Sequence, residues 1–149
     1  MIQRIQTLYL FILAGLCALA AALPLASLAA GQTPFELCAY GLKDAAGEIV
    51  KPTVYMAILI DAACVLPLVT IFLYNRRLLQ FRLCIVEIVL LVGAQVIMLV
   101  YFFLAKRQAT DWVMHLPLFL PAAGTVFSWL AARGIMRDEI MVRSLDRIR

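Results

Sequence analysis

The sequence has few charged residues and lacks the motifs by which many enzymes and nucleotide-binding proteins are recognised. Lys, Arg, Asp and Glu together make up 15% of the 149 residues, whereas they make up about a quarter of a typical soluble domain. A Gly-rich phosphate loop, an HExxH motif and a GxSxG motif are all absent from the sequence. We therefore predict that the protein is not an enzyme and has no catalytic residue, no cofactor and no metal ion.

The cysteines also lack a metal-binding pattern. The chain has four of them, Cys17, Cys38, Cys64 and Cys84, and no two have the short spacing of a metal site. Three lie inside apolar runs, so we interpret them as small apolar side chains in a packed interior. A Cys17–Cys64 disulfide is a less favoured alternative, which rests on the expectation that both residues lie near the middle of a membrane.

Hydrophobic residues, in contrast, make up 65% of the chain, which is more than one soluble core of this size can bury. They gather in four runs, each close to the roughly 20 residues that a helix needs to cross a bilayer. The runs are residues 8–30, 53–74, 83–105 and 112–132. None alternates with the period of two that a membrane β-barrel requires. The predicted fold class is an all-α membrane protein, a single domain over residues 1–149 with four transmembrane helices in an up-down-up-down antiparallel bundle.

The first apolar run has some features of a cleavable signal peptide, because Arg4 precedes it and the small residues 26–30 close it. The run is longer than the apolar core of a usual signal peptide, however, and the first helix of a multi-span protein can act as an uncleaved anchor. We therefore favour a retained helix.

Basic residues are distributed unevenly between the two sides of the predicted bundle. Four, Lys43, Lys51, Lys106 and Arg107, lie on one side, and the other nine of the 13 lie on the side of the two termini. Because Lys and Arg are enriched in cytoplasmic loops, both termini are predicted to be cytoplasmic. The basic residues on this side are predicted to form a basic face that binds anionic lipid headgroups or a partner, which fits the net charge of +4. No nucleic-acid partner is predicted. The nine are Arg4, Arg76, Arg77, Arg82, Arg133, Arg137, Arg143, Arg147 and Arg149.

Two segments outside the apolar runs carry further expectations. Residues 31–52 belong to the outer side, where the turn-forming stretch 43–47 suggests a short hairpin. The tail, residues 133–149, is predicted to be a charged cytoplasmic helix, because Glu139 and Arg143 have the spacing and order of a helical ion pair. The tail either extends the fourth helix or forms a separate helix against headgroups or a partner, and the sequence leaves both alternatives open.

Three polar residues interrupt the apolar runs and are the candidate site residues: Asp61, Glu87 and Gln95. A charged side chain at the centre of a membrane helix costs about 2.5–3.5 kcal/mol on insertion scales. At a rise of ~1.5 Å per residue, Asp61 and Gln95 lie at one level, where they can form a hydrogen bond, whereas Asp61 and Glu87 differ by about 13 Å in depth. Glu87 is expected to pair with an arginine. We favour helix packing over an ion path, because no ladder of titratable groups crosses the full thickness.

Four segments of the chain resemble a known family. They are MIQRIQTLYL (residues 1–10), NRRLLQFRLC (75–84), RGIMRDE (133–139) and VRSLDRIR (142–149). Together they are similar to the four-span family of Bacteroidetes called domain of unknown function 4293. The resemblance implies an inner-membrane protein of a Gram-negative cell. It implies no site residue, because the family has no assigned activity.

Two functions of different classes fit these observations. The first is a non-enzymatic accessory or structural subunit of a membrane complex or homo-oligomer, which fits the small size and the basic face. The second is a small transporter or ion-coupled channel that uses Asp61, Glu87 and Gln95. We favour the first, and expect the lipid bilayer and a membrane-protein partner or a second copy to be its contacts.

Overall fold

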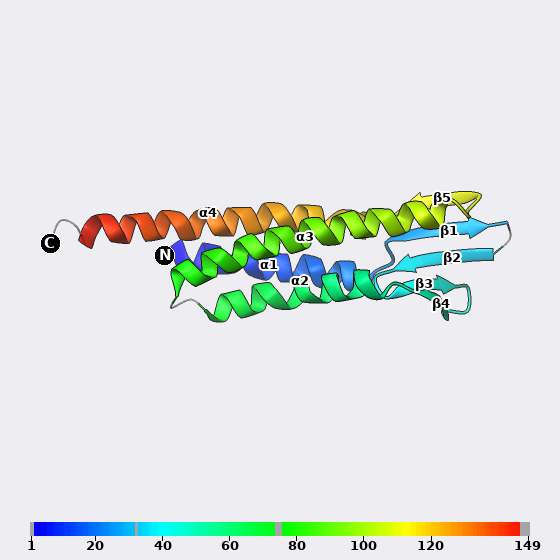
Figure 1. Ribbon diagram of the computed structural model, residues 1–149, viewed down its shortest axis with the longest axis horizontal. Coiled ribbons are helices and arrows are strands. Elements are labelled where there is room, and N and C mark those ends of the chain that lie inside the picture. The colour runs from blue at the N-terminus through cyan, green and yellow to red at the C-terminus, as the bar shows by residue number, and fades with distance from the viewer. Residues whose placement is uncertain (1, 32, 74–75, 147–149) are drawn as a thin grey trace.

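The computed structural model describes residues 2–31, 33–73 and 76–146, and within them the chain forms four long helices and one β-sheet (Figure 1). The helices lie side by side as a bundle, and the sheet extends from one end of it. We call that end the sheet end, and the opposite end, where α2 turns into α3, the tail end. The elements are α1 (Ile2–Ala22), β1 (Ala26–Ala30), β2 (Thr33–Cys38), β3 (Gly41–Asp44), β4 (Ile49–Pro52), α2 (Val54–Phe72), α3 (Arg77–Lys106), β5 (Asp111–Met114), the 3-10 helix η1 (Leu116–Phe119) and α4 (Leu120–Asp146).

Each helix contributes a regular stripe of buried residues to the interior of the bundle. The buried positions follow one another at spacings of three and four residues, which is the pattern of helices packed side by side in a left-handed bundle. The main contacts of α1 and of α3 are with α2 and α4. The stripes are Gln6, Leu10, Leu13, Cys17 and Ala20 on α1; Met56, Ile60, Ala63, Pro67 and Thr70 on α2; Gln80, Cys84, Glu87, Leu91, Ala94 and Met98 on α3; and Pro121, Gly124, Ser128, Ala131 and Ile135 on α4.

The prediction of an all-α fold is wrong, because the connections between helices at the sheet end form a five-stranded antiparallel sheet. Four strands come from the α1–α2 connection. The fifth comes from the α3–α4 connection and pairs with β1, so that the order is β4-β3-β2-β1-β5. The strand β1 lies inside the apolar run 8–30, whose helix ends at Ala22. A hairpin does form near the predicted turn, as β3–β4 with Gly47 at a φ of 82°, but Lys43 and Asp44 belong to β3 and not to the turn, and the hairpin supplies only two of the five strands of the sheet.

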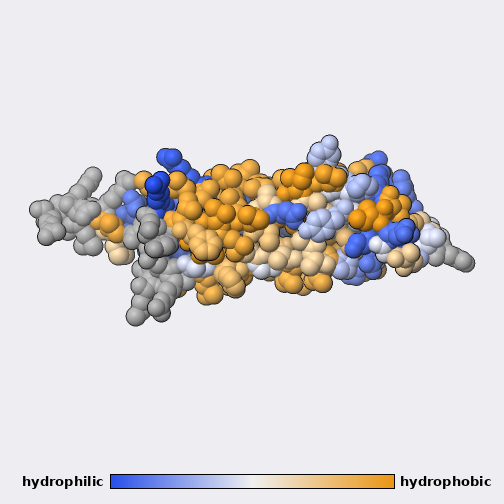
Figure 2. Space-filling model, turned by 90° about the horizontal axis from the view of Figure 1, so that it is seen from below, coloured by the Kyte–Doolittle hydropathy of each residue, from blue (hydrophilic) through white to orange (hydrophobic). Residues whose placement is uncertain are grey.

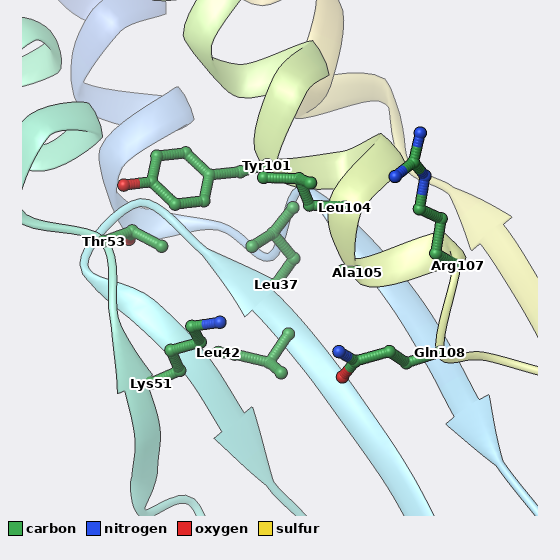
Figure 3. Close-up of a pocket in the computed structure, with 9 residues that line it drawn as sticks. All are labelled: Leu37, Leu42, Lys51, Thr53, Tyr101, Leu104, Ala105, Arg107 and Gln108. Atoms are coloured by element: carbon green, nitrogen blue, oxygen red, sulfur yellow. The ribbon is translucent and has the colours of Figure 1, made fainter.

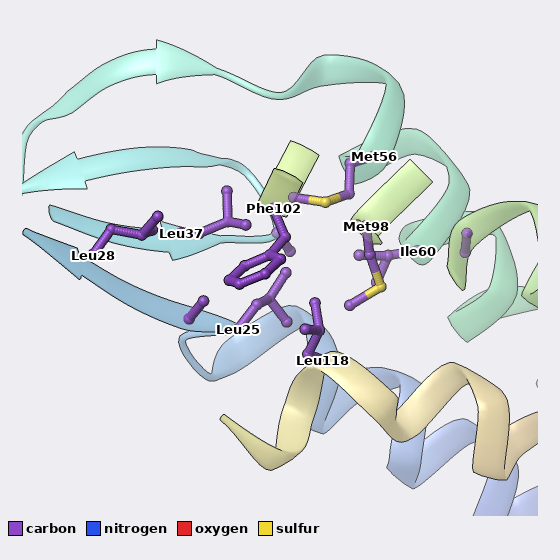
Figure 4. Close-up of a cluster of buried hydrophobic side chains, with 11 residues drawn as sticks. Leu25, Leu28, Leu37, Met56, Ile60, Met98, Phe102 and Leu118 are labelled. Atoms are coloured by element: carbon purple, nitrogen blue, oxygen red, sulfur yellow. The ribbon is translucent and has the colours of Figure 1, made fainter. Parts of the chain in front are cut away.

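The sheet and the bundle share one buried core. The helix α3 is 30 residues long, or about 45 Å, and Figure 1 shows its C-terminal turns running alongside the strands. Phe102 of α3 thereby belongs to one buried cluster with Leu28 of β1 and Leu37 of β2, which the helix residues Met56 and Leu118 complete (Figure 4). This packing fixes the sheet to the end of the bundle.

On the face shown in Figure 2 the bundle is mainly hydrophobic, and hydrophilic residues gather toward the two ends of the molecule. Four segments are long and apolar enough to cross a membrane, and between 28% and 39% of each is buried inside the structure. Most of their apolar surface therefore needs lipid or another protein around it. The segments are Ile5–Ala22, Val54–Phe72, Leu78–Lys106 and Leu116–Val142.

The helix α4 continues without a break to Asp146, so the described part of the tail extends the fourth helix. Gln6 Nε2 donates a hydrogen bond of 2.8 Å to Asp138 Oδ2 and ties the first turns of α1 to this extension. Because Gln6 is buried, the bond also satisfies a polar group that would otherwise lack water.

Candidate functional site

Asp61 does not meet Gln95, and the hydrogen bond predicted between them is not formed. Asp61 is the next residue after the buried Ile60 on α2. Because each residue of a helix is rotated from the one before it, the Asp61 side chain points away from the bundle interior and is exposed. Tyr40, in the turn between β2 and β3, donates a hydrogen bond of 2.9 Å to Asp61 Oδ1. This bond raises the pKa of the Tyr40 hydroxyl, because an ionised tyrosine would lose the bond and face a carboxylate. The contact joins the sheet to α2.

Gln95 is held against the start of α4. Its Nε2 donates to the Leu118 carbonyl at 3.1 Å, and its Oε1 accepts from the Ala122 N–H at 3.1 Å. In a continuous α-helix these two backbone groups would bond to each other, but here the chain changes from the 3-10 helix η1 to α4 between them. The Gln95 amide bridges this junction, so its evident role is structural.

Glu87 lies in the interior of the bundle, in the half of α3 nearer the tail end. It is 1% exposed and shares its stripe with Cys84 and Leu91. Across the described part of the chain, neither carboxyl oxygen has a hydrogen-bond partner, so the arginine predicted to pair with it does not do so there. The neighbouring buried cluster, which includes Leu10 and Leu13 of α1, is apolar. Buried polar groups without a partner are rare and call for an explanation.

The described arginines of the predicted basic face lie around the tail end. Arg76, Arg82, Arg133 and Arg137 are exposed, and the Arg133 guanidinium lies 5.4 Å from the centroid of the Trp129 ring. Exposed cations beside an aromatic ring at the end of a membrane helix suit contact with lipid headgroups. The side chains of Arg4, Arg77 and Arg143 and the whole of Arg147 and Arg149 lie outside the described residues.

Thiol and metal chemistry gain no support from the geometry. All four cysteines are free, so the alternative of a Cys17–Cys64 disulfide is wrong. Cys64 Sγ instead donates to the Ala14 carbonyl at 3.9 Å, and burial raises the pKa of the Cys38 thiol in the sheet. No group of three or more His, Cys, Asp or Glu side chains that could hold a metal ion occurs among the described residues.

One contact between distant residues was not expected from the sequence. Ser27 Oγ of β1 and His115 Nε2, just after β5, are hydrogen-bonded at 2.7 Å. The backbone N–H of His115 also donates to the Leu25 carbonyl at 3.0 Å. The two bonds fasten the end of β5 to β1. The sequence spacing of 88 residues gave no sign of this pair.

The edge strand β5 and the 3-10 helix η1 after it carry exposed apolar side chains, with Trp112 on the face of the sheet that meets α3 and the next residue, Val113, on the other face. Trp112 and Val113 on β5 are 42% and 58% exposed, and Leu116 and Phe119 on η1 are 77% and 47% exposed. We call these four residues the edge stripe. At the opposite edge of the sheet, β4 contains Lys51 and Pro52, which are residues that discourage contact between sheet edges. The two edges therefore differ in composition.

These features define a class of protein, namely one whose four bundled helices are long and apolar enough to span a membrane and carry an antiparallel sheet at one end. The chain belongs to the family described as domain of unknown function (DUF4293), whose model matches residues 2–148. This match confirms the family predicted from the four sequence segments. No curated protein matches the sequence. The family description names no activity, so a function has to be argued from the structure.

Proposed function

We propose that this protein is a non-enzymatic accessory or structural subunit of the membrane, which associates through the edge stripe with a partner chain, in the first place a second copy of itself. The observation that supports this most is the stripe itself. Its members are exposed at the outer edge of the sheet, at Trp112 and Val113, and at the start of the fourth segment that could span a membrane, at Leu116 and Phe119. A partner that covers both parts has to stand beside the bundle in the same membrane.

The proposed orientation follows the basic residues. The described arginines of the basic face lie at the tail end, and cytoplasmic segments are enriched in such residues. We propose on this basis that both termini are cytoplasmic and that the sheet stands on the outer surface, and the family resemblance adds the proposal that the membrane is a bacterial inner membrane. In this position the sheet meets water on one side and the lipid headgroups at its base.

The alternative function, a small transporter or ion-coupled channel, has one observation in its favour, which is the buried and unpartnered carboxyl of Glu87. The other two residues on which it relied are engaged elsewhere. Asp61 faces outward and binds Tyr40, and Gln95 binds the backbone of α4. An ion path needs several polar groups that line one route, so we place this function second.

Replacement of Val113 by Lys tests the proposal. In a mild detergent the unchanged protein is expected to elute as an assembly of two or more chains, or with a partner membrane protein. The Val113→Lys variant is expected to bind at least about tenfold more weakly, because a charge in an apolar contact loses its water without gaining a partner. Light scattering coupled to gel filtration measures the mass of each species.

Ile49→Lys is the matched control. Ile49 is 52% exposed, compared with 58% for Val113, but it lies on β4 with Lys51 and Pro52. This variant is expected to keep the mass of the unchanged protein. A single unassociated chain for the unchanged protein, or equal masses for the protein and its Val113→Lys variant, would contradict the proposal.

A further inference from the structure

A groove runs beside α3 on one face of the sheet. Two adjoining cavities of about 280 Å³ and about 320 Å³ form it, and they share Leu42, Lys51, Ala105 and Gln108 in their linings. The groove arises because a helix is wider than one strand but narrower than the whole sheet. A helix with its side chains is roughly 10 Å wide, whereas neighbouring strands lie about 4.8 Å apart, so that one helix covers about two strands. Since α3 packs on β1 and reaches Trp112 of β5, the strands β3 and β4 stay uncovered on this face.

The lining of the groove is apolar at its centre and polar at its margins (Figure 3). Leu37 and Leu42 form the floor. Lys51 and Gln108 reach toward one another from the two walls, and Arg107 turns outward from the end of α3. Both side-chain charges in this lining, on Lys51 and Arg107, are positive, and no carboxylate lines either cavity within the described residues.

The groove also begins at the end of a helix whose length fits the hydrocarbon layer of a membrane. The helix α2 has 19 residues, or about 28 Å, which matches the ~30 Å hydrocarbon layer. Thr53, the residue before α2, lines the groove at its base together with Tyr101 of α3. An acyl chain that rises from the adjacent leaflet therefore reaches Leu37 and Leu42 without crossing water, and a headgroup above it reaches Lys51.

We propose that this groove binds an anionic phospholipid of the outer leaflet, with its phosphate at Lys51 and Gln108 and the upper part of one acyl chain on Leu37 and Leu42. Charge complementarity selects an anionic headgroup, and the apolar floor at the membrane boundary selects a lipid over a soluble anion. The inference rests on the proposed orientation but not on the partner contact, because none of the four residues of the edge stripe lines either cavity.

Native mass spectrometry of the detergent-purified protein tests the proposal, with phosphatidylglycerol and phosphatidylcholine of the same acyl chains as probes. Phosphatidylglycerol is expected to be retained more than phosphatidylcholine. Lys51→Ala is expected to lower its retention about fivefold, the usual effect of one basic group near anionic lipid. Lys43→Ala is the matched control, because Lys43 lies on the neighbouring strand β3 and lines neither cavity. Glycerol phosphate, which has the headgroup charge but no acyl chain, is expected not to compete.

A second variant tests the apolar floor. Leu42→Trp fills the groove and leaves Lys51 and Arg107 in place, so it is expected to abolish retention of phosphatidylglycerol while circular dichroism still shows the folded protein. Equal retention of the two lipids overturns the proposal, as does an equal effect of Lys51→Ala and Lys43→Ala. Competition by glycerol phosphate overturns the proposal of a lipid ligand and indicates a soluble anion. If Leu42→Trp does not fold, the comparison of the two lysine variants decides.

Discussion

Replacement of Gln95 by Leu is expected to lower the free energy of unfolding by about 2–4 kcal/mol. The Gln95 amide is bonded to two backbone groups, the Leu118 carbonyl and the Ala122 N–H. Leucine fills a similar space but bonds to neither, and lipid offers no water in its place. Both groups at the start of α4 would then lack a partner. Unfolding of the detergent-solubilised protein, followed by tryptophan fluorescence, measures the loss.

Gln108→Leu is the matched control for this variant. Gln108 lies just beyond the C-terminus of α3 and is exposed, so the same chemical change is expected to alter the free energy of unfolding by less than about 0.5 kcal/mol. Equal stabilities of the Gln95→Leu and Gln108→Leu variants would show that the amide bridge contributes nothing, and would return Gln95 to the set of functional candidates.

Replacement of Glu87 by Met is expected to have the opposite effect on stability, and to raise the free energy of unfolding by about 1–3 kcal/mol. Glu87 is 1% exposed and neither of its carboxyl oxygens has a partner in the described structure. Methionine has a similar length and adapts to an apolar interior. The same unfolding measurement tests this. Glu36→Met, a change at an exposed position of β2, is expected to stay within about 0.5 kcal/mol of the unchanged protein.

A loss of stability in Glu87→Met would contradict the structure, because it would mean that the carboxyl has a partner. A gain would mean that the protein tolerates a destabilising group, which is a common mark of function. Flux measurements in liposomes then separate the two proposed functions. Ion or solute flux that disappears in Glu87→Met would favour the transporter, whereas the absence of flux in both proteins fits a structural subunit.

The four helices could be predicted from the sequence, because an isolated apolar run of about 20 residues has no other way to cross a membrane. The sheet could not be predicted. Its strand β1 consists of apolar residues, 26–30, that continue the first run without a change in composition. Its strand β5 pairs with β1 across more than 80 residues of sequence, and short strands of four to six residues carry little period-two pattern.

The arrangement of the candidate site residues could also be predicted only in part. Depth along a helix follows from the rise per residue, so the similar levels of Asp61 and Gln95 could be estimated. Their contact could not, because it depends on the rotation of each helix, and Asp61 lies one residue past the buried stripe of α2. Tyr40, the partner that Asp61 has, belongs to a turn whose position is set by the unpredicted sheet. The groove at Lys51 depends on the same sheet, so it could not be predicted from the sequence either.

Site-directed labelling from the two sides of the membrane tests the central claim most directly, namely that the bundle spans the membrane with its sheet outside and its termini inside. Single Glu48→Cys and Arg137→Cys variants, made in a background in which the four native cysteines are replaced by Ala, are treated with a membrane-impermeant thiol reagent. Both positions are exposed, and Glu48, between β3 and β4, lies outside the proposed partner contact. Glu48→Cys is expected to be labelled in intact spheroplasts, and Arg137→Cys is expected to be labelled only after lysis. Labelling of both variants from the same side, or the reverse order, would contradict it.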